Sequence, residues 1–159
     1  MAELIVCFFG HRTFNDGIEI EQKLYTLIAE LIRQTEYVEF LVGREGEFDL
    51  LAASVIRRAK QTIYDANSSL VWVQPYIKAE YLRDPDAYEQ YYDRIEFCEQ
   101  SAVSYPKAAI QLRNCMMVDR SDLCVFYVNH PSGGAWQTLQ YALRKNKRVI
   151  NLADCLQYE

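Results

Sequence analysis

The sequence of 159 residues has no long apolar run and no secretory signal pattern. No stretch reaches the roughly 18 consecutive apolar residues from which a membrane-spanning helix is recognised, so we expect no membrane segment. The residues after Met1 enter an apolar run without the basic region and small-residue cleavage site of a signal peptide. These absences predict a cytoplasmic protein.

The sequence also has little that would hold a metal ion. It contains only two histidines, His11 and His130, and no Cys-x-x-Cys pair, so we expect no metal site, and no pattern calls for a cofactor. The cysteines lie mostly in apolar runs, which favours buried free thiols over disulfides. They are Cys7, Cys98, Cys115, Cys124 and Cys155.

Positive charge is in deficit, with a formal net charge of −5. Proteins that grip a nucleic-acid backbone usually carry a basic face, so the acidic balance argues against nucleic acid as a partner. The densest basic stretch, 144–148, lies between a predicted helix and a predicted strand, where cations also suit a helix C-terminus.

Apolar runs of strand length alternate with segments of helical period, which is the pattern of parallel strands joined by crossover helices. We therefore expect residues 1–159 to form one α/β domain with a three-layer Rossmann-like fold, a mainly parallel sheet flanked by helices. The expected strands are 4–9, 38–42, 69–73, 95–98, 123–128 and 148–152, and the expected helices are 18–32, 48–63, 106–118 and 135–145.

The tyrosine-rich segment 76–92 is less regular and is expected to hold a short helix after Asp84-Pro85. We interpret its tyrosines as packing residues, because aromatic side chains at helical spacing are more often core than function. A partner surface, a dimer contact and a lid are the alternatives.

Parallel sheets of this type bind ligands beyond the carboxyl ends of their strands. The first candidate loop is Gly10-His11-Arg12, where a glycine lets backbone amides approach a ligand and an arginine can pair with phosphate. A simple strand-ending turn with a solvated arginine is the alternative.

The second candidate loop has Gly43 and Gly46 three residues apart between a strand and a helix, as in a phosphate cradle. It is not Gly-x-Gly-x-x-Gly and lacks the P-loop lysine. Glu45 and Glu47 are unfavourable neighbours for a phosphate unless they point away. Asp49 suits the first turn of a helix.

The third candidate loop runs through Ser132, Gly133 and Gly134 into a predicted helix that contains Thr138. The free amides of such a helix start point at whatever occupies the crevice, so we favour anion binding over a plain glycine-rich connection. Arg113 stands in an otherwise apolar helix and either extends to water or reaches into the crevice.

Together these segments resemble the SLOG superfamily of Rossmann-like domains, which includes LOG-type nucleotide phosphoribohydrolases, the DNA-processing protein DprA and many small bacterial and phage proteins. The most similar branch is the small YpsA-like, DUF1273-type proteins. The resemblance is carried by CFFGHR at 7–12, FLVGREGEFDLLAASV at 40–55 and RNCMMVDRSDLCVFYVNHPSGGAWQTLQYALRKNKRVINL at 113–152.

The resemblance to LOG enzymes implies a test for activity, because their Arg-Lys and Pro-Gly-Gly-x-Gly-Thr-x-x-Glu motifs are associated with cleavage of the base–ribose bond. Arg113 matches the arginine and is the catalytic candidate if the protein is an enzyme. Gln140 stands where the family has glutamate, and a neutral amide cannot transfer the proton of a carboxylate. The resemblance thus implies a retained phosphate cradle without the LOG-type carboxylate. Glu45, Glu47 and Asp119 remain open as substitutes.

The sequence therefore predicts a protein that binds a nucleotide or nucleotide-derived phosphorylated small molecule at the carboxyl ends of the strands, as a sensor or regulatory protein. The alternatives are a LOG-like nucleoside-5′-monophosphate phosphoribohydrolase and a protein-interaction or DNA-associated module. The resemblance also implies a homodimer. The expected ligand residues are Gly10, His11, Arg12, Gly43, Gly46, Arg113, Ser132, Gly133, Gly134 and Thr138.

Overall fold

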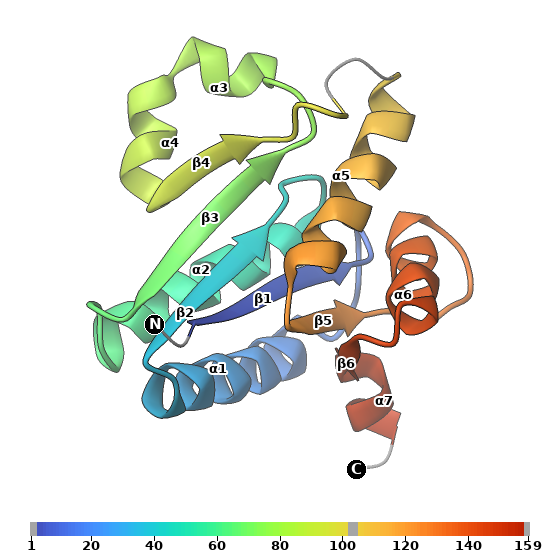
Figure 1. Cartoon of the computed structure of the whole chain (residues 1–159). Coiled ribbons are helices and arrows are strands. Elements are labelled where there is room, and N and C mark those ends of the chain that lie inside the picture. Colours follow the sequence, from blue (N-terminus) through green and yellow to red (C-terminus); the bar gives the residue numbers. More distant parts are fainter. Residues whose placement is uncertain (1–2, 102–104, 158–159) are drawn as a thin grey trace.

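The computed structural model describes residues 3–101 and 105–157, in which six parallel strands form one sheet in the order β4-β3-β2-β1-β5-β6 (Figure 1). The strands are β1 (Glu3–Gly10), β2 (Tyr37–Val42), β3 (Ser68–Gln74), β4 (Arg94–Phe97), β5 (Leu123–Tyr127) and β6 (Arg148–Asn151). The helices are α1 (Gly17–Gln34), α2 (Glu47–Thr62), α3 (Ala79–Arg83), α4 (Pro85–Tyr91), α5 (Pro106–Arg120), α6 (Gly134–Arg144) and α7 (Leu152–Gln157). The predicted α/β Rossmann-like class is confirmed.

The chain order reverses at the centre of the sheet. From β1 it proceeds through β2 and β3 to β4, and it then returns to place β5 on the other side of β1. Helices α1 and α2 cover one face of the sheet, and α5 and α6 cover the other (Figure 1). The loops that follow β1 and β5 therefore diverge to opposite faces, which leaves a crevice between them.

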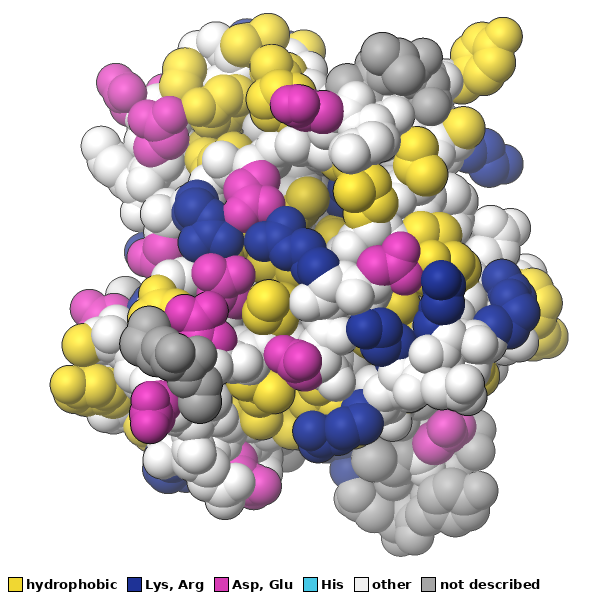
Figure 2. Space-filling view, viewed as in Figure 1, with side chains coloured by type: hydrophobic (Ala, Val, Ile, Leu, Met, Phe, Trp, Pro, Cys, Tyr) yellow, Lys and Arg dark blue, Asp and Glu magenta, His cyan; other side chains and the backbone are white. Residues whose placement is uncertain are grey.

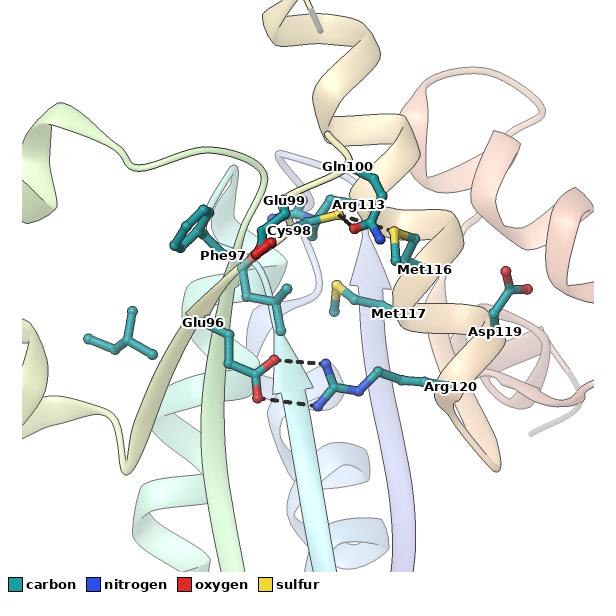
Figure 3. Close-up of a pocket in the computed structure, with 12 residues that line it drawn as sticks. Glu96, Phe97, Cys98, Glu99, Gln100, Arg113, Met116, Met117, Asp119 and Arg120 are labelled. Atoms are coloured by element: carbon teal, nitrogen blue, oxygen red, sulfur yellow. Dashed lines mark hydrogen bonds and ion pairs between the residues drawn. The ribbon is translucent and has the colours of Figure 1, made fainter. Parts of the chain in front are cut away.

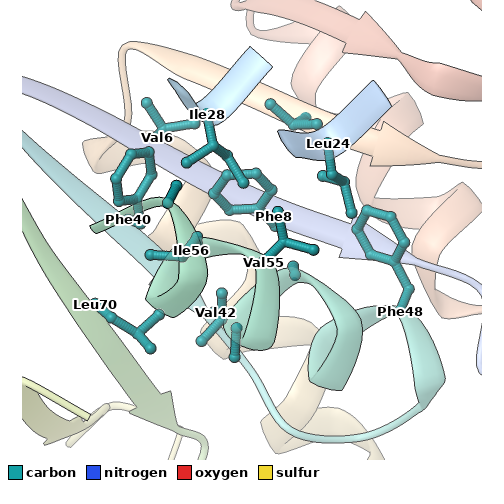
Figure 4. Packing of buried hydrophobic residues seen from close by; sticks show 14 of the residues in the cluster. Val6, Phe8, Leu24, Ile28, Phe40, Val42, Phe48, Val55, Ile56 and Leu70 are labelled. Carbon is teal, nitrogen blue, oxygen red and sulfur yellow. The ribbon is translucent and has the colours of Figure 1, made fainter. Parts of the chain in front are cut away.

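Alternating side chains build a core on each face of the sheet. Phe8 and Phe40 pack against Ile28 of α1 and Val55 of α2 (Figure 4). On the other face, strand residues such as Phe126 belong to a cluster with residues of α5 and α6. The central strands are covered on both sides, which explains their continuous apolar runs.

Two elements differ from the sequence prediction. Segment 76–92 holds two short helices, α3 and α4, and the second begins where Asp84 accepts a hydrogen bond from the backbone N–H of Ala87. Residues 152–157 form α7, whereas the prediction ended with the strand at 148–152. Both helices that the prediction missed, α3 and α7, are shorter than two turns, too short for hydrophobic periodicity to reveal.

The tyrosines of this segment pack around a buried tryptophan. The rings of Tyr81, Tyr88 and Tyr92 lie 6.2, 5.3 and 5.3 Å from that of Trp72, which is fully buried. The packing interpretation holds for these three residues.

The cysteines and the helices bear on two further expectations. Cys7, Cys98 and Cys124 are buried free thiols and Cys115 is a half-buried one, while the side chain of Cys155 lies outside the described part.

No helix within the described residues is long and apolar enough to cross a membrane.

Candidate functional site

A cleft of about 520 Å³ opens at the carboxyl ends of β1, β2 and β5. The three predicted loops converge there, because these strands are neighbours in the sheet. Every predicted ligand residue lines this cleft except Ser132 and Thr138. Lys107 and Asp49 are among the lining residues that the sequence analysis did not include in its ligand set.

Two of the loop glycines have a packing role. A Cβ on Gly10 would lie 2.3 Å from the Phe48 ring, and one on Gly46 would lie 2.6 Å from Cα of Arg12. The backbone N–H of Glu47 also donates to the carbonyl of Arg12 at 2.8 Å. The glycines thus let the loops after β1 and β2 pack closely and form one wall of the cleft.

Arg113 is 2% exposed and joins three parts of the site. Its guanidinium donates to the carbonyl of Val73 at 2.7 Å, to Oδ1 of Asn114 at 3.0 Å and to Oε1 of Glu45 at 2.7 Å. Of the two alternatives for Arg113, extension to water or reach into the crevice, the structure therefore shows the second. Its hydrogen bonds go to protein acceptors, which makes it a support for the loop after β2.

Glu45 is the carboxylate that Arg113 holds. Lys78 Nζ lies 3.4 Å from its second oxygen, and the backbone N–H of Arg44 donates to the first at 3.2 Å. Burial by itself raises the pKa of Glu45, but the charges of Arg113 and Lys78 outweigh it and leave that pKa below its ordinary value. Glu45 is therefore ionised, with its charge compensated.

Asp49 behaves in the opposite way. It lies in the first turn of α2, and its Oδ2 accepts a hydrogen bond from the backbone N–H of Glu45 at 2.9 Å. Burial and then the charge of Glu45 raise the pKa of Asp49 to about 7. Two carboxyl groups with pKa values pushed apart in one cleft are typical of functional sites. The sequence showed only a charge suited to a helix start.

A buried hydrogen-bond chain fixes the start of α6. Asn114 Nδ2 donates to Thr138 Oγ1 at 3.1 Å, and the Thr138 hydroxyl donates to the carbonyl of Gly134 at 3.0 Å. Gln111 Nε2 donates to the same carbonyl at 3.1 Å. Thr138 is fully buried and does not line the cleft, so it acts by positioning the first turn of α6.

The N-terminus of α6 faces the cleft through Gly133, Gly134 and Ala135. Gly133 has φ of 92° and ψ of 175°, a backbone conformation open essentially to glycine. The first helical bond runs from the Gln137 N–H to the Gly133 carbonyl, so the N–H groups before Gln137 have no acceptor inside the helix. Free N–H groups and the positive end of the helix dipole suit an anion in general.

Two exposed cations share the cleft with that helix end. Arg12 and Lys107 both line the cleft and both are exposed. Lys107 is in the first turn of α5, which follows β4 and therefore starts at the same edge of the sheet. That placement could have been anticipated from the alternation of strands and helices.

The three residues considered as substitutes for the LOG-type carboxylate lie in different parts of the structure. Glu45 lines the cleft, whereas the exposed Glu47 accepts from the Phe14 N–H at 3.4 Å. Asp119 binds the Tyr141 hydroxyl at 2.8 Å and lines a different cavity. Gln140 is half-buried on α6 and is not among the cleft residues.

Comparisons with known proteins bear on the fold. No protein-family model and no curated protein matches the sequence. DprA from Helicobacter pylori superposes with a TM-score of 0.63 at 16% identity, covering 93% of this chain and 64% of that one. DprA from Streptococcus pneumoniae superposes with a TM-score of 0.65 at 12% identity, covering 92% and 49%.

The chain has the Rossmann-like fold of these DprA proteins. It spans only 64% and 49% of their lengths, and at such identities the likeness concerns the fold alone. The H. pylori structure describes a single-stranded DNA binding mode of that protein.

A second cavity, of about 710 Å³, lies between β4 and α5; we call it the groove (Figure 3). Glu96 pairs there with Arg120 at 2.7 Å and with Arg94 at 2.8 Å, and Arg94 also pairs with Glu39 at 3.2 Å. Figure 2 shows lysines and arginines interspersed with acidic side chains on this side of the molecule. The cation Arg120 of the groove is therefore engaged by Glu96, which also pairs with the neighbouring Arg94.

Proposed function

We propose that the cleft binds a nucleotide or nucleotide-derived phosphorylated small molecule, and that the protein acts as a sensor or regulatory binding protein. The observation that carries this proposal is the N-terminus of α6, which opens into the cleft between the diverging β1 and β5 loops. A phosphate there would accept hydrogen bonds from the amides of Gly134 and Ala135. Arg12 and Lys107 would add charge at the rim.

The acidic groups of the cleft are compatible with an anion. The charge of Glu45 is compensated by Arg113 and Lys78. Asp49, with its pKa raised to about 7 by burial and by Glu45, is about half protonated at neutral pH. The proposal thus meets the objection that two carboxyl groups would repel a phosphate.

The experiment is a thermal unfolding series with AMP, ADP-ribose, NAD, cyclic ADP-ribose and ribose-5-phosphate, with adenosine as the unphosphorylated control. A ligand that binds only the native state raises its apparent stability. We expect a dose-dependent rise with a phosphorylated member and none with adenosine. Arg12→Ala should reduce the rise, whereas Arg144→Ala, which removes an exposed arginine from the far end of α6, should not. No rise with any member would contradict the proposal.

A second candidate is a LOG-like phosphoribohydrolase, which Asp49 favours. A carboxyl group that retains its proton near neutral pH can act as a general acid toward a leaving base. Incubation with purine nucleoside monophosphates and detection of free base tests this function. Release of free base by the wild-type protein but not by Asp49→Asn would support this function. No free base at high protein concentration would rule the function out.

A third candidate is a DNA-associated module, which the DprA fold neighbours favour. Binding of single-stranded oligonucleotides, followed by fluorescence anisotropy at several salt concentrations, tests it. Affinity that falls steeply with salt would indicate phosphate contacts. Loss of that affinity in Lys107→Ala would place the strand over the cleft.

We also propose that the chain belongs to the YpsA-like, DUF1273-type branch of the SLOG superfamily and forms the homodimer that this resemblance implies. The support is that the loops carrying the resemblance meet in one cleft. Light scattering coupled to size-exclusion chromatography gives the mass in solution. A monomeric mass across the working concentration range would contradict the dimer.

A further inference from the structure

Two histidine rings form a parallel stack at the cleft. His11 follows β1 and His130 follows β5, and their ring centroids are 3.7 Å apart with an interplanar angle of 3°. His11 is 8% exposed, whereas His130 is exposed, and both line the cleft. One face of His130 is therefore covered by His11, while the residue as a whole is exposed.

The stack is anchored to the core. The His11 ring lies edge-on to that of Tyr127, which is 1% exposed, with centroids 6.3 Å apart. His11 Nε2 accepts a hydrogen bond from the backbone N–H of Asn129 at 3.1 Å. Burial and then the neighbouring His130 lower the pKa of His11, so the inner ring is neutral at pH 7 and does not repel the outer one.

The outer ring is also oriented. Nδ1 of His130 lies 2.9 Å from the hydroxyl of Ser132, within hydrogen-bonding distance. Among the described residues of the cleft, the only other aromatic ring is that of Phe9, which is 5% exposed and belongs to the core. His130 is thus an oriented flat ring in the cleft, three residues before Gly133, the N-cap of α6.

We propose that the uncovered face of His130 is the stacking platform for the nucleobase of the ligand. This inference rests on the proposed function and extends it, because it identifies the ligand class as a base-containing nucleotide rather than a bare sugar phosphate. The phosphate lies at the N-terminus of α6 and the base lies on His130. Every base has a π-face, so stacking tolerates base identity.

The test separates the base from the phosphate. Dissociation constants of AMP, GMP, UMP and ribose-5-phosphate are measured by calorimetry for the wild-type protein, His130→Ala and His130→Phe. Since stacking on an aromatic side chain contributes substantially to base affinity, we expect His130→Ala to weaken AMP about tenfold and ribose-5-phosphate less than twofold. His130→Phe keeps a flat ring and should retain AMP within about threefold.

A spectroscopic measurement reports the stack directly. The His130 ring protons should shift upfield on addition of AMP, because they enter the shielding region of the base, and should not do so with ribose-5-phosphate. His130 is exposed, so both variants should unfold at the wild-type temperature, which is checked before binding is compared.

Several outcomes would overturn the platform. Unchanged AMP affinity in His130→Ala, equal losses for AMP and ribose-5-phosphate, or a His130→Phe variant as weak as His130→Ala would each do so. If ribose-5-phosphate binds and no nucleotide binds better, the platform fails and the phosphate site stands. If none of the four ligands binds, the proposed function fails together with the platform.

Discussion

The cleft and the groove are neighbouring cavities with opposite chemistry. The groove is the larger, about 710 Å³ against 520 Å³, but its Arg120 is engaged in an ion pair with Glu96 of the same groove. The cleft presents the amides of a helix start and two flanking cations to a prospective ligand. Volume alone therefore does not select a candidate site, whereas polar groups that converge on a cavity favour one.

Arg113 lines both cavities, and its hydrogen bonds decide to which it belongs. It donates to Glu45 on the cleft side and to the end of β3, while the ion pairs of the groove are completed by Arg94 and Arg120. The following predictions test this contrast between the cleft, whose loop after β2 is held by Arg113, and the groove, which contains the Glu96–Arg120 ion pair.

The largest effect is expected for Arg113→Ala. Removal of one member of a buried ion pair leaves Lys78 as the remaining cation beside the Glu45 carboxylate, so the free energy of unfolding should fall by up to about 3 to 5 kcal/mol. Urea denaturation measures this change. In Arg113→Ala combined with Glu45→Gln, the loss should be smaller than the sum of the single losses. Strictly additive losses would show that the pair is not coupled.

Asp49→Asn should stabilise the protein at alkaline pH. The pKa of Asp49 is raised from 3.8 to about 7, so the native state keeps a proton that the unfolded state releases near pH 4. The stability that this proton gives is lost as pH rises from about 4 to about 7. Asparagine does not titrate, so the variant should gain at most about 4 kcal/mol over wild type at pH 8.

The control for Asp49→Asn is pH itself. The gain in unfolding free energy should be clearly smaller at pH 5, where the native carboxyl group is still protonated. Chemical denaturation at pH 5, 6, 7 and 8 gives the profile. A gain that does not depend on pH would mean that Asp49 does not titrate in this window.

Gly133→Ala should cost about 1 to 3 kcal/mol, because alanine is strained at φ of 92° and ψ of 175°. No atom lies within 4 Å of the new methyl group, so the cost would come from the backbone alone. Gly134→Ala is the matched control: its methyl group would meet only the flexible end of Gln111 at 3.1 Å. Thermal unfolding should rank Gly133→Ala clearly below Gly134→Ala, and equal values would remove the strain argument.

The smallest effect is expected in the groove. Arg120 is 38% exposed, and exposed ion pairs contribute little, so Arg120→Ala should change the unfolding free energy by less than about 1 kcal/mol. It should also leave the response to phosphorylated ligands unchanged. A reduced ligand response would show that the groove takes part in binding, which would break the contrast.

The features that the sequence predicted are those that leave a local signature in it. The apolar runs at 4–9 and 123–128 predicted β1 and β5 to within about a residue, because a strand covered on both faces is apolar throughout. The loop glycines were also identified, because turns and helix starts have local signatures. Periodicity could not show α3 or α7, whose few residues complete less than two turns.

By itself, the sequence determined an alternation of strands and helices, with anion-suited residues at three strand ends. Only the tertiary structure decided that these ends meet, since the order β2-β1-β5 makes neighbours of strands far apart in the chain. It also turned Arg113 toward Glu45, buried Thr138 of α6 against Asn114 and stacked His11 on His130. Side-chain partners and pKa values depend on long-range neighbours and burial, which local pattern does not contain.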